Sequence, residues 1–169
     1  MNVAIADAGS FKDPSGRVYE IDGEILRSVA PCAAVKPALL WDLGCNTGEY
    51  AEVALAAGAG RVIGFDFDHK ALERAYGRAI RGSLPFLPLF QDGANPSPAQ
   101  GWSTVERKGL SDRASADGLL ALAFQHHLCI GRNVPLDEVV AWLVSLAPRG
   151  VDRVRALRRS HRTAHARPA

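Results

Sequence analysis

The sequence predicts an α/β fold with a parallel sheet, and two observations support this prediction. Between residues 38 and 146, short apolar runs that read as strands alternate with segments of helical apolar spacing. Three of the four expected strands also end at or within two residues of an aspartate, namely Asp42, Asp66 and Asp92. Because ligands of such sheets bind at the carboxyl ends of the strands, the three carboxylates indicate one shared site.

The expected elements follow the periodicity of apolar residues and the positions of glycine and proline. Strands are expected at 38–43, 61–65, 86–90 and 118–123, helices at 49–57, 69–80 and 136–146, and a proline-containing loop at 95–102. Gly58 and Gly82 are expected to end the first two helices. Upstream, residues 1–35 look irregular, apart from a small hairpin expected between 17–21 and 24–29.

The composition is that of a soluble globular protein with one domain. The chain has 169 residues, of which 47% are apolar and 22% charged. No apolar run is long enough for a membrane helix, and the first residues lack a signal-peptide pattern. Cys32, Cys45 and Cys129 have no paired spacing, so neither a metal site nor a disulfide framework is expected. We therefore expect a cytoplasmic protein without a bound metal.

Charge is unevenly distributed along the chain. Residues 1–147 carry 13 basic and 17 acidic side chains, whereas residues 148–169 carry 7 basic side chains and one acid. The sequence therefore predicts an irregular segment at 1–35, a binding domain at 36–147 and a basic, disordered tail at 148–169. A basic tail can bind nucleic acid, but the frameshift considered below explains it better, so nucleic acid is not the expected partner.

The segment 39–50, L-L-W-D-L-G-C-N-T-G-E-Y, reads as a buried strand, a glycine turn and the start of a helix. Such turns place backbone N–H groups and a helix N-terminus against a ligand. The dinucleotide pattern G-x-G-x-x-G, begun at Gly44, requires glycines where the chain has Asn46 and Glu49. A nicotinamide-dependent oxidoreductase is thus the weaker alternative, because Glu49 would also repel a pyrophosphate.

The turn instead resembles motif I of the class I S-adenosylmethionine-dependent methyltransferases, an acid followed by three glycines at alternate positions. Here the motif reads Asp42, Gly44, Asn46 and Gly48. Asparagine replaces the middle glycine, a tolerable change because asparagine also enters left-handed backbone conformations. The resemblance implies a Rossmann-like sheet in which Asp42 and the turn serve the amino-acid end of S-adenosylmethionine.

The same resemblance implies roles for residues after the next two strands. Asp66, 22 residues after Gly44, would accept hydrogen bonds from both ribose hydroxyls of the cofactor, and Phe67 would lie against its adenine ring. Asp92 and Gly93 resemble the motif in which a carboxylate receives the adenine amino group. An Asp-Gly pair is, however, also an ordinary turn signal.

Four stretches are similar to a subgroup of nodulation-protein-like methyltransferases. They are W-D-L-G-C-N-T-G at 41–48, D-G-A-N-P-S-P-A-Q-G-W at 92–102, A-L-A-F-Q-H-H-L at 121–128 and N-V-P-L at 133–136. The resemblance covers residues 36–147 and implies methyl transfer to an acceptor that the sequence does not identify. His126 and His127 follow the fourth strand, where a catalytic base can act, although adjacent histidines are more often structural.

The tail departs from what the resemblance implies. A class I methyltransferase sheet has seven strands, whereas four are expected before residue 148, so the fold should lack its last strands. A permitted set of codons for 150–169, read one base later, restores an I-E-F-V-P strand of the kind expected at this point. We therefore hypothesise a frameshifted tail, with a catalytically impaired remnant as the alternative to an active enzyme. Codons that cannot encode that strand would exclude the frameshift.

Overall fold

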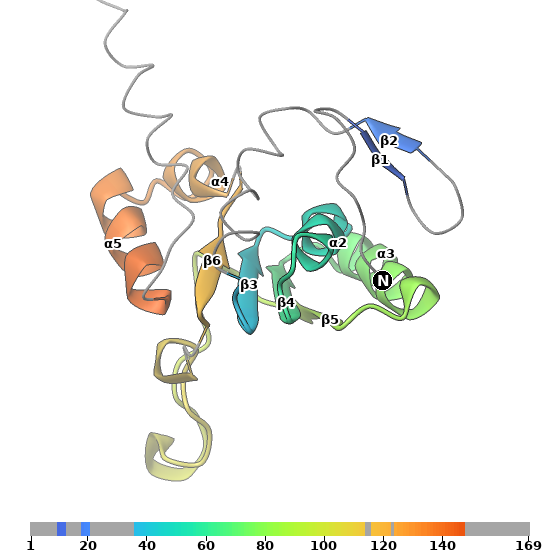
Figure 1. Ribbon diagram of the computed structural model, residues 1–169. Coiled ribbons are helices and arrows are strands. Elements are labelled where there is room, and N and C mark those ends of the chain that lie inside the picture. Colours follow the sequence, from blue (N-terminus) through green and yellow to red (C-terminus); the bar gives the residue numbers. More distant parts are fainter. Residues whose placement is uncertain (1–9, 13–17, 21–35, 114–115, 123, 148–169) are drawn as a thin grey trace, which may run out of the picture.

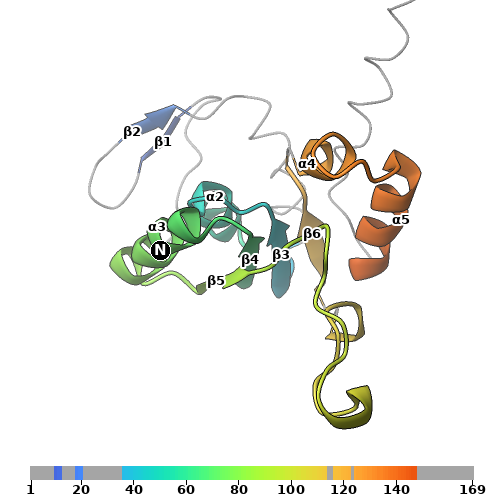
Figure 2. The same cartoon turned by 180° about the vertical axis from the view of Figure 1, so that it is seen from behind.

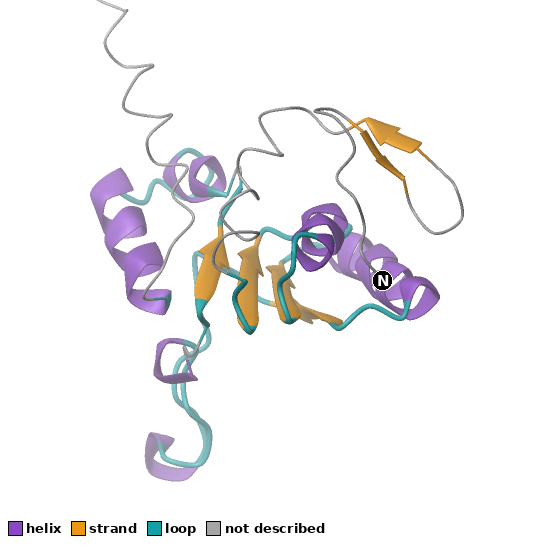
Figure 3. Ribbon diagram, in the orientation of Figure 1, coloured by secondary structure: helices purple, strands orange, loops and turns teal. Residues whose placement is uncertain are grey.

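The computed structural model describes residues 10–12, 18–20, 36–113, 116–122 and 124–147, and Figure 1 shows their arrangement. The elements are β1 (Ser10–Lys12), β2 (Val18–Glu20), β3 (Leu39–Leu43), α2 (Glu49–Ala56), β4 (Arg61–Asp66), α3 (His69–Gly82), β5 (Phe86–Phe90), the 3-10 helices η1 (Trp102–Thr104) and η2 (Ser111–Arg113), β6 (Gly118–Leu120), α4 (Gln125–Cys129) and α5 (Leu136–Leu146). Strands and helices alternate from β3 to β5 (Figure 3), as the sequence predicts. None of the described helices is long and apolar enough to cross a membrane.

The centre of the fold is a four-stranded parallel sheet with the strand order β5-β4-β3-β6. The chain adds strands outward from β3 through β4 to β5, and then returns to the other side of β3 for β6. The pairing of β3 with β4 runs from Leu39↔Arg61 to Leu43↔Phe65. Because the direction of addition reverses beside β3, the carboxyl ends of β3 and β6 flank a switch point, where α/β sheets bind ligands. The predicted α/β fold with a Rossmann-like sheet is confirmed.

Helices cover the two faces of this sheet, with α2 and α3 on one face and α5 on the other (Figures 1 and 2). Side chains of β3 alternate between the two resulting cores: Leu40 belongs to the α2/α3 core, whereas Trp41 and Leu43 belong to the α5 core. This alternation follows from the two-residue period of a strand. Each fully buried leucine contributes roughly 1.5–3 kcal/mol to the free energy of folding.

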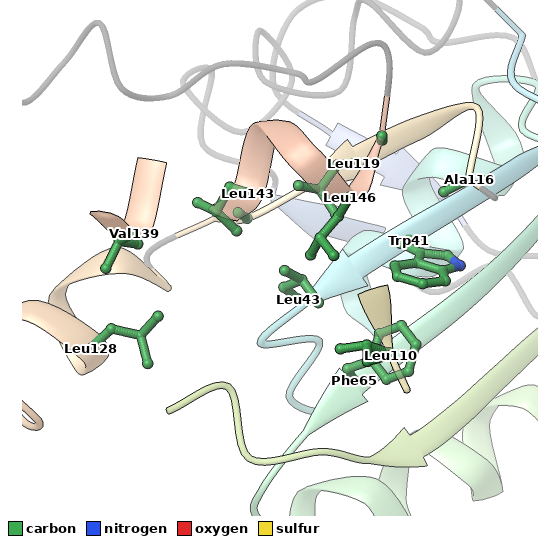
Figure 4. Close-up of a cluster of buried hydrophobic side chains, with 12 residues drawn as sticks. Trp41, Leu43, Phe65, Leu110, Ala116, Leu119, Leu128, Val139, Leu143 and Leu146 are labelled. Atoms are coloured by element: carbon green, nitrogen blue, oxygen red, sulfur yellow. The ribbon is translucent and has the colours of Figure 1, made fainter. Parts of the chain in front are cut away.

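The α5 core joins the sheet to the helix that follows it. Figure 4 shows Leu143 and Leu146 of α5 lying over β3 near Leu43. Trp41 meets Phe65 edge to face, with ring centroids 5.1 Å apart and an interplanar angle of 71°. Such aromatic pairs add to the stabilisation that burial alone provides. The core thereby fixes the neighbouring strands β3 and β4, whose carboxyl ends carry the candidate site.

Helix α3 has clear signals at both of its ends. The Asp68 side chain accepts hydrogen bonds from the backbone N–H groups of Lys70, at 2.8 Å, and Ala71, at 3.3 Å. This N-cap satisfies two amides that would otherwise lack partners. At the other end, the helix extends two residues beyond the expected range 69–80 and ends at Gly82, the residue predicted to stop it. Gly82 is the last helical residue, and the next residue, Ser83, takes the left-handed conformation with φ of 48°.

A short hairpin lies near the N-terminus. Strand β2 pairs antiparallel with β1, in the register Ser10↔Glu20. Residues 24–29 lie outside the described residues, and so does the tail at 148–169 with its frameshift hypothesis. The predicted division into 1–35, 36–147 and 148–169 stays a prediction.

The connection between β5 and β6 contains an arm at residues 95–113. It projects from the end of the sheet that lies away from α4 (Figure 2). An antiparallel bridge between Gln100 and Arg107 joins its two strands of chain. Trp102, at its tip, is 83% exposed, whereas Leu110, at its base, is buried in the α5 core. The predicted loop is therefore longer than expected. Strand β6 is shorter than predicted, because Ala121 and Leu122 are not in the strand.

Candidate functional site

A tight turn after β3 forms the centre of the candidate site. The backbone N–H groups of Gly44 and Cys45 both donate to the carbonyl oxygen of Phe65, at 2.8 and 3.1 Å. Gly44, Asn46 and Gly48 have φ angles of 76°, 46° and 79°. These are left-handed conformations, which glycine adopts without strain and asparagine more readily than most residues. The expected tolerance of the turn for Asn46 is therefore confirmed.

Asp66, at the end of β4, connects this turn to the next helix. Its Oδ2 accepts a hydrogen bond from the Asn46 backbone N–H at 2.8 Å, and its Oδ1 accepts one from the Asp68 N–H at 2.9 Å. A carboxylate has about four acceptor positions. Asp66 is only partly buried and lines a cavity, so it keeps acceptor capacity toward a ligand.

Asp92 follows β5 in a similar position. The backbone N–H of Gln91 donates to the Asp66 carbonyl oxygen at 2.9 Å, which holds the ends of β4 and β5 together. The Asp92 carboxylate accepts a hydrogen bond from the Ala94 N–H at 2.9 Å through Oδ1. Its Oδ2 lies 3.2 Å from Nη2 of Arg132. Two strand ends thus present carboxylates to one place.

These groups surround a cavity of about 510 Å³, a size typical of pockets for small molecules and cofactors. It is lined by Gly44, Asn46, Tyr50, Asp66, Phe67, Asp68, Ala71, Gln91, Asp92, Gly93, Ala94, Leu122, Phe124, His127, Leu128, Gly131 and Arg132. The lining comes from the ends of β3, β4 and β5 on one side and from the α4 region on the other.

The structure brings most of the residues singled out in the sequence to this cavity. Gly44, Asn46, Asp66, Phe67, Asp92, Gly93 and His127 line it. Asp42, Gly48 and His126 do not belong to the lining. The rings of His126 and His127 lie 4.0 Å apart on α4, and of the two only His127 belongs to the lining.

Asp42 lies buried behind the turn, with 1% of its surface exposed. Burial, with the negative charge of Asp66 as a smaller cause, raises the pKa of this carboxyl from 3.8 to about 7. Its Oδ2 has no hydrogen-bond partner among the described residues. Burial, with the charge of Asp42 as a smaller cause, also raises the pKa of the Cys45 thiol. The site therefore has an acidic interior beneath its turn.

Gly48 has a structural position at the start of α2. It is buried, with the positive φ given above, and a methyl group on it would overlap the ring of Phe86. Glycine is therefore required for two independent reasons, the backbone conformation and the space that Phe86 occupies. Its contribution to a binding site is to let the turn meet the helix at this angle.

Phe124 packs between two parts of the site. A Cβ on Gly44 would lie 3.2 Å from the Phe124 ring, and one on Gly93 would overlap it. The ring also lies 6.4 Å from that of Trp142 on α5. The absence of side chains at Gly44 and Gly93 thus makes room for an aromatic ring as well as for a ligand.

Several residues that line the cavity were not expected from the sequence. Arg132 and Phe124 reach the site only through tertiary contacts, with 40 residues separating Arg132 from Asp92, and no local pattern marks them. Asp68 did carry a signal, because an aspartate directly before a helical pattern is a typical N-cap. Among the residues that the structure describes, no group of three or more His, Cys, Asp and Glu side chains forms a metal site.

Comparison with known proteins gives relatives of part of the chain. No protein-family model matches it. It is 57% identical over 116 residues to the nodulation protein NoeA of Rhizobium meliloti (strain 1021), covering 69% of this chain and 24% of NoeA. It is 30% identical over 128 residues to the ribosomal protein L11 methyltransferase of Hamiltonella defensa subsp. Acyrthosiphon pisum (strain 5AT), covering 62% of this chain and 41% of that protein.

Among solved structures, the chain resembles WbdD with a TM-score of 0.52 and 17% identity, over 75% of this chain and 26% of WbdD. The chain spans about a quarter of the length of NoeA and about two fifths of that of the L11 methyltransferase. The sheet order and these relatives agree on one fold. The described part of this chain therefore has the Rossmann-like fold of the class I S-adenosylmethionine-dependent methyltransferases, with the nodulation protein NoeA among its relatives.

Proposed function

We propose that this chain binds S-adenosylmethionine in the cavity at the carboxyl ends of β3, β4 and β5, and that it acts in methyl transfer. The observation that carries the proposal is the convergence of the Gly44–Gly48 turn, Asp66 and Asp92 on one cavity. When bound, S-adenosylmethionine would supply an electrophilic methyl group.

The acids suit this cofactor better than they suit a phosphate-bearing one. S-adenosylmethionine carries a positive sulfonium and an ammonium group and no phosphate. Glu49 and Glu52 lie in the first turn of α2, where a pyrophosphate would need the positive end of the helix dipole. Asp42 adds a buried carboxyl beneath the turn, and a cationic group nearby would favour its ionised form.

Two residues on β4 and its following loop suit the nucleoside part. Asp66 keeps acceptor capacity for two ribose hydroxyls, since each of its oxygens accepts one backbone hydrogen bond. Phe67 lines the cavity and is 57% exposed, so its ring face is available to an adenine ring. Asp92 would receive the adenine amino group beside its contact with Arg132.

His127 is the better placed of the two candidate bases. It lines the cavity from α4, opposite the strand ends, and a histidine can accept a proton near neutral pH. In this proposal the acceptor molecule lies between the cofactor and α4, and correct positioning supplies much of the rate. His126 does not belong to the cavity lining.

The proposal is tested by calorimetry with S-adenosylhomocysteine, S-adenosylmethionine and NADH. We expect the first two to bind and NADH not to bind. The Asp66→Ala variant should lose roughly 100-fold in affinity, because two hydrogen bonds to a charged acceptor contribute about 1.5 kcal/mol each. Glu73→Ala is the matched control, since Glu73 is an exposed acid on α3 outside the cavity lining. Binding of NADH alone would overturn the proposal.

A further inference from the structure

Arg78, on α3, contacts the turn at residues 44–48 (the cofactor turn). It does not belong to the cavity lining. Its Nε donates a hydrogen bond to the carbonyl oxygen of Thr47 at 3.0 Å. The two residues lie 31 positions apart in the sequence, and the Arg78 side chain is 20% exposed. A largely buried guanidinium therefore holds a backbone group of the turn.

The same guanidinium is held in place by two acids of α2. Its Nη1 lies 2.6 Å from Oε2 of Glu52, whose side chain is 16% exposed, and its Nη2 lies 3.4 Å from Oε1 of Glu49. Arginine offers its donors in a rigid, planar fork, so these contacts fix the direction in which Nε points. The Arg78 guanidinium thus connects α3 with the cofactor turn and with the first helical turn of α2.

The contact falls on a peptide group that is otherwise easily rotated. The peptide between Thr47 and Gly48 precedes a glycine, which can take either sign of φ. Its N–H donates to the Cys45 carbonyl oxygen at 2.8 Å, and its carbonyl oxygen accepts from Arg78. Both ends of this peptide plane are thus fixed, so it keeps the orientation that gives Gly48 its φ of 79°.

We infer that Arg78 is a positioning residue that fixes the Thr47–Gly48 peptide and thereby the shape of the cofactor turn. The inference deepens the proposed function and rests on it only for the identity of the ligand that the turn serves. Loss of Arg78 would let the peptide rotate, which would disturb the part of the site expected to hold the amino-acid end of the cofactor. The nucleoside end, held by Asp66 and Asp92, would be affected less.

A lysine substitution separates positioning from simple charge neutralisation. Arg78→Lys keeps a positive charge for Glu52 and Glu49 but lacks the fork that also reaches Thr47. Arg78→Met removes the charge and retains much of the apolar stem. Arg74→Met is the matched control, because Arg74 is an exposed arginine of the same helix. If the role were charge alone, Arg78→Lys would behave as the wild type.

The first measurement is amide hydrogen exchange by NMR and needs no ligand. We expect the Gly48 amide to exchange about tenfold faster in Arg78→Lys and in Arg78→Met, as for the loss of one hydrogen bond to a charged donor. The Val62 amide, in the middle of the sheet, should keep its rate, and Arg74→Met should match the wild type. A wild-type Gly48 rate in Arg78→Lys, or an equal acceleration at Gly48 and Val62, would overturn the inference.

The second measurement compares S-adenosylhomocysteine with adenosine, which lacks the amino-acid end. We expect both Arg78 variants to lose about tenfold in affinity for S-adenosylhomocysteine and less than about twofold for adenosine. Equal losses for the two ligands would contradict the inference. If the wild type bound neither ligand, the proposed function would fail, while the exchange rate of Gly48 would still decide the role of Arg78.

Discussion

The two walls of the cavity are built in different ways. The strand-end wall, at residues 44–48, 66–68 and 91–94, is held through hydrogen bonds of its own backbone groups, such as those from Gly44 and Cys45 to Phe65. The α4 wall, at residues 124–132, meets it through side chains, namely the ring of Phe124 and the ion pair of Arg132 with Asp92. The Arg132 side chain is 57% exposed.

This difference indicates which part of the site is preorganised. Backbone bonds between neighbouring strands fix the positions of the strand-end carboxylates before any ligand arrives. Exposed ion pairs contribute little, typically 0–1 kcal/mol, and permit movement. We therefore expect the strand-end wall to define the cofactor and the α4 wall to adapt to the acceptor. The following predictions test that division, from the largest expected effect to the smallest.

The largest effect should come from the pH dependence of Asp42, beneath the strand-end wall. Because its pKa is raised from 3.8 to about 7, the folded protein keeps a proton that the unfolded chain has already released between these values. The free energy of unfolding should therefore fall as the pH rises from about 4 to about 7. The total fall should be on the order of 4 kcal/mol, at about 1.4 kcal/mol per pH unit.

Urea unfolding of the wild type and of Asp42→Asn over this pH range measures the effect. The asparagine variant cannot ionise at this position, so its stability should fall less steeply with pH. Parallel curves for the two proteins would show that Asp42 does not titrate in this way. The contribution is full below about pH 4 and is lost above about pH 7, the window that the raised pKa defines.

Gly48→Ala should be the next most damaging change. The new methyl group would overlap Phe86, and alanine would have to adopt a φ of 79°. Left-handed backbone costs about 1–2 kcal/mol and overpacking about 1–3 kcal/mol, so the free energy of unfolding should fall by roughly 2–4 kcal/mol. Chemical denaturation gives this value directly.

Gly77→Ala is the matched control for that substitution. Gly77 lies inside α3, and its added methyl group would lie 3.0 Å from Nη1 of Arg81, an exposed and flexible side chain that can move. Alanine is favoured over glycine in a helix by about 0.5–1 kcal/mol, so this variant should gain stability. Equal losses in the two variants would indicate that the geometry at Gly48 is not special.

Phe124→Ala tests the α4 wall. Complete removal of a buried phenylalanine costs about 3–5 kcal/mol, and Phe124 is only half-buried, so a loss of about 2 kcal/mol is expected. The amide exchange of Gly48 should stay unchanged, because the Thr47–Gly48 peptide is held by its bonds to Cys45 and Arg78. Faster exchange at Gly48 in this variant would show that the two walls are not independent.

Arg132→Ala should have the smallest effect. Its ion pair with Asp92 is largely exposed, so the free energy of unfolding should change by less than about 1 kcal/mol. Thermal unfolding at low and high salt measures this, and the difference between wild type and variant should shrink at high salt. A large, salt-independent loss would mean that the α4 wall is as firmly held as the strand-end wall.

The sequence predicted the strand-end wall well because its signals are local. The apolar runs of β3, β4 and β5 each end beside an aspartate, and parallel strands bring such ends together at one edge. The left-handed turn at Gly44 could likewise be read from glycine and asparagine spacing. The expected range of α3, 69–80, stops two residues early, because the helix continues to Gly82 and the left-handed residue that follows it is Ser83.

The α4 wall and the Arg78 contact could not be predicted in the same way. Arg78 meets Thr47 across 31 residues, and Arg132 meets Asp92 across 40. Such contacts depend on how helices pack on the sheet, which no local spacing encodes. Phe124 is one apolar residue among several near β6, and only the packed fold reveals that its ring lies against Gly44 and Gly93.

The most direct test of the account is an NMR titration of the wild-type chain with S-adenosylhomocysteine. We predict that the largest amide shifts occur in the strand-end wall, at residues 44–48, 66–68 and 91–94, with smaller shifts at 124–132. Shifts confined to residues outside these segments would contradict the account. An unchanged spectrum with S-adenosylhomocysteine, together with shifts on addition of NADH, would contradict it as well.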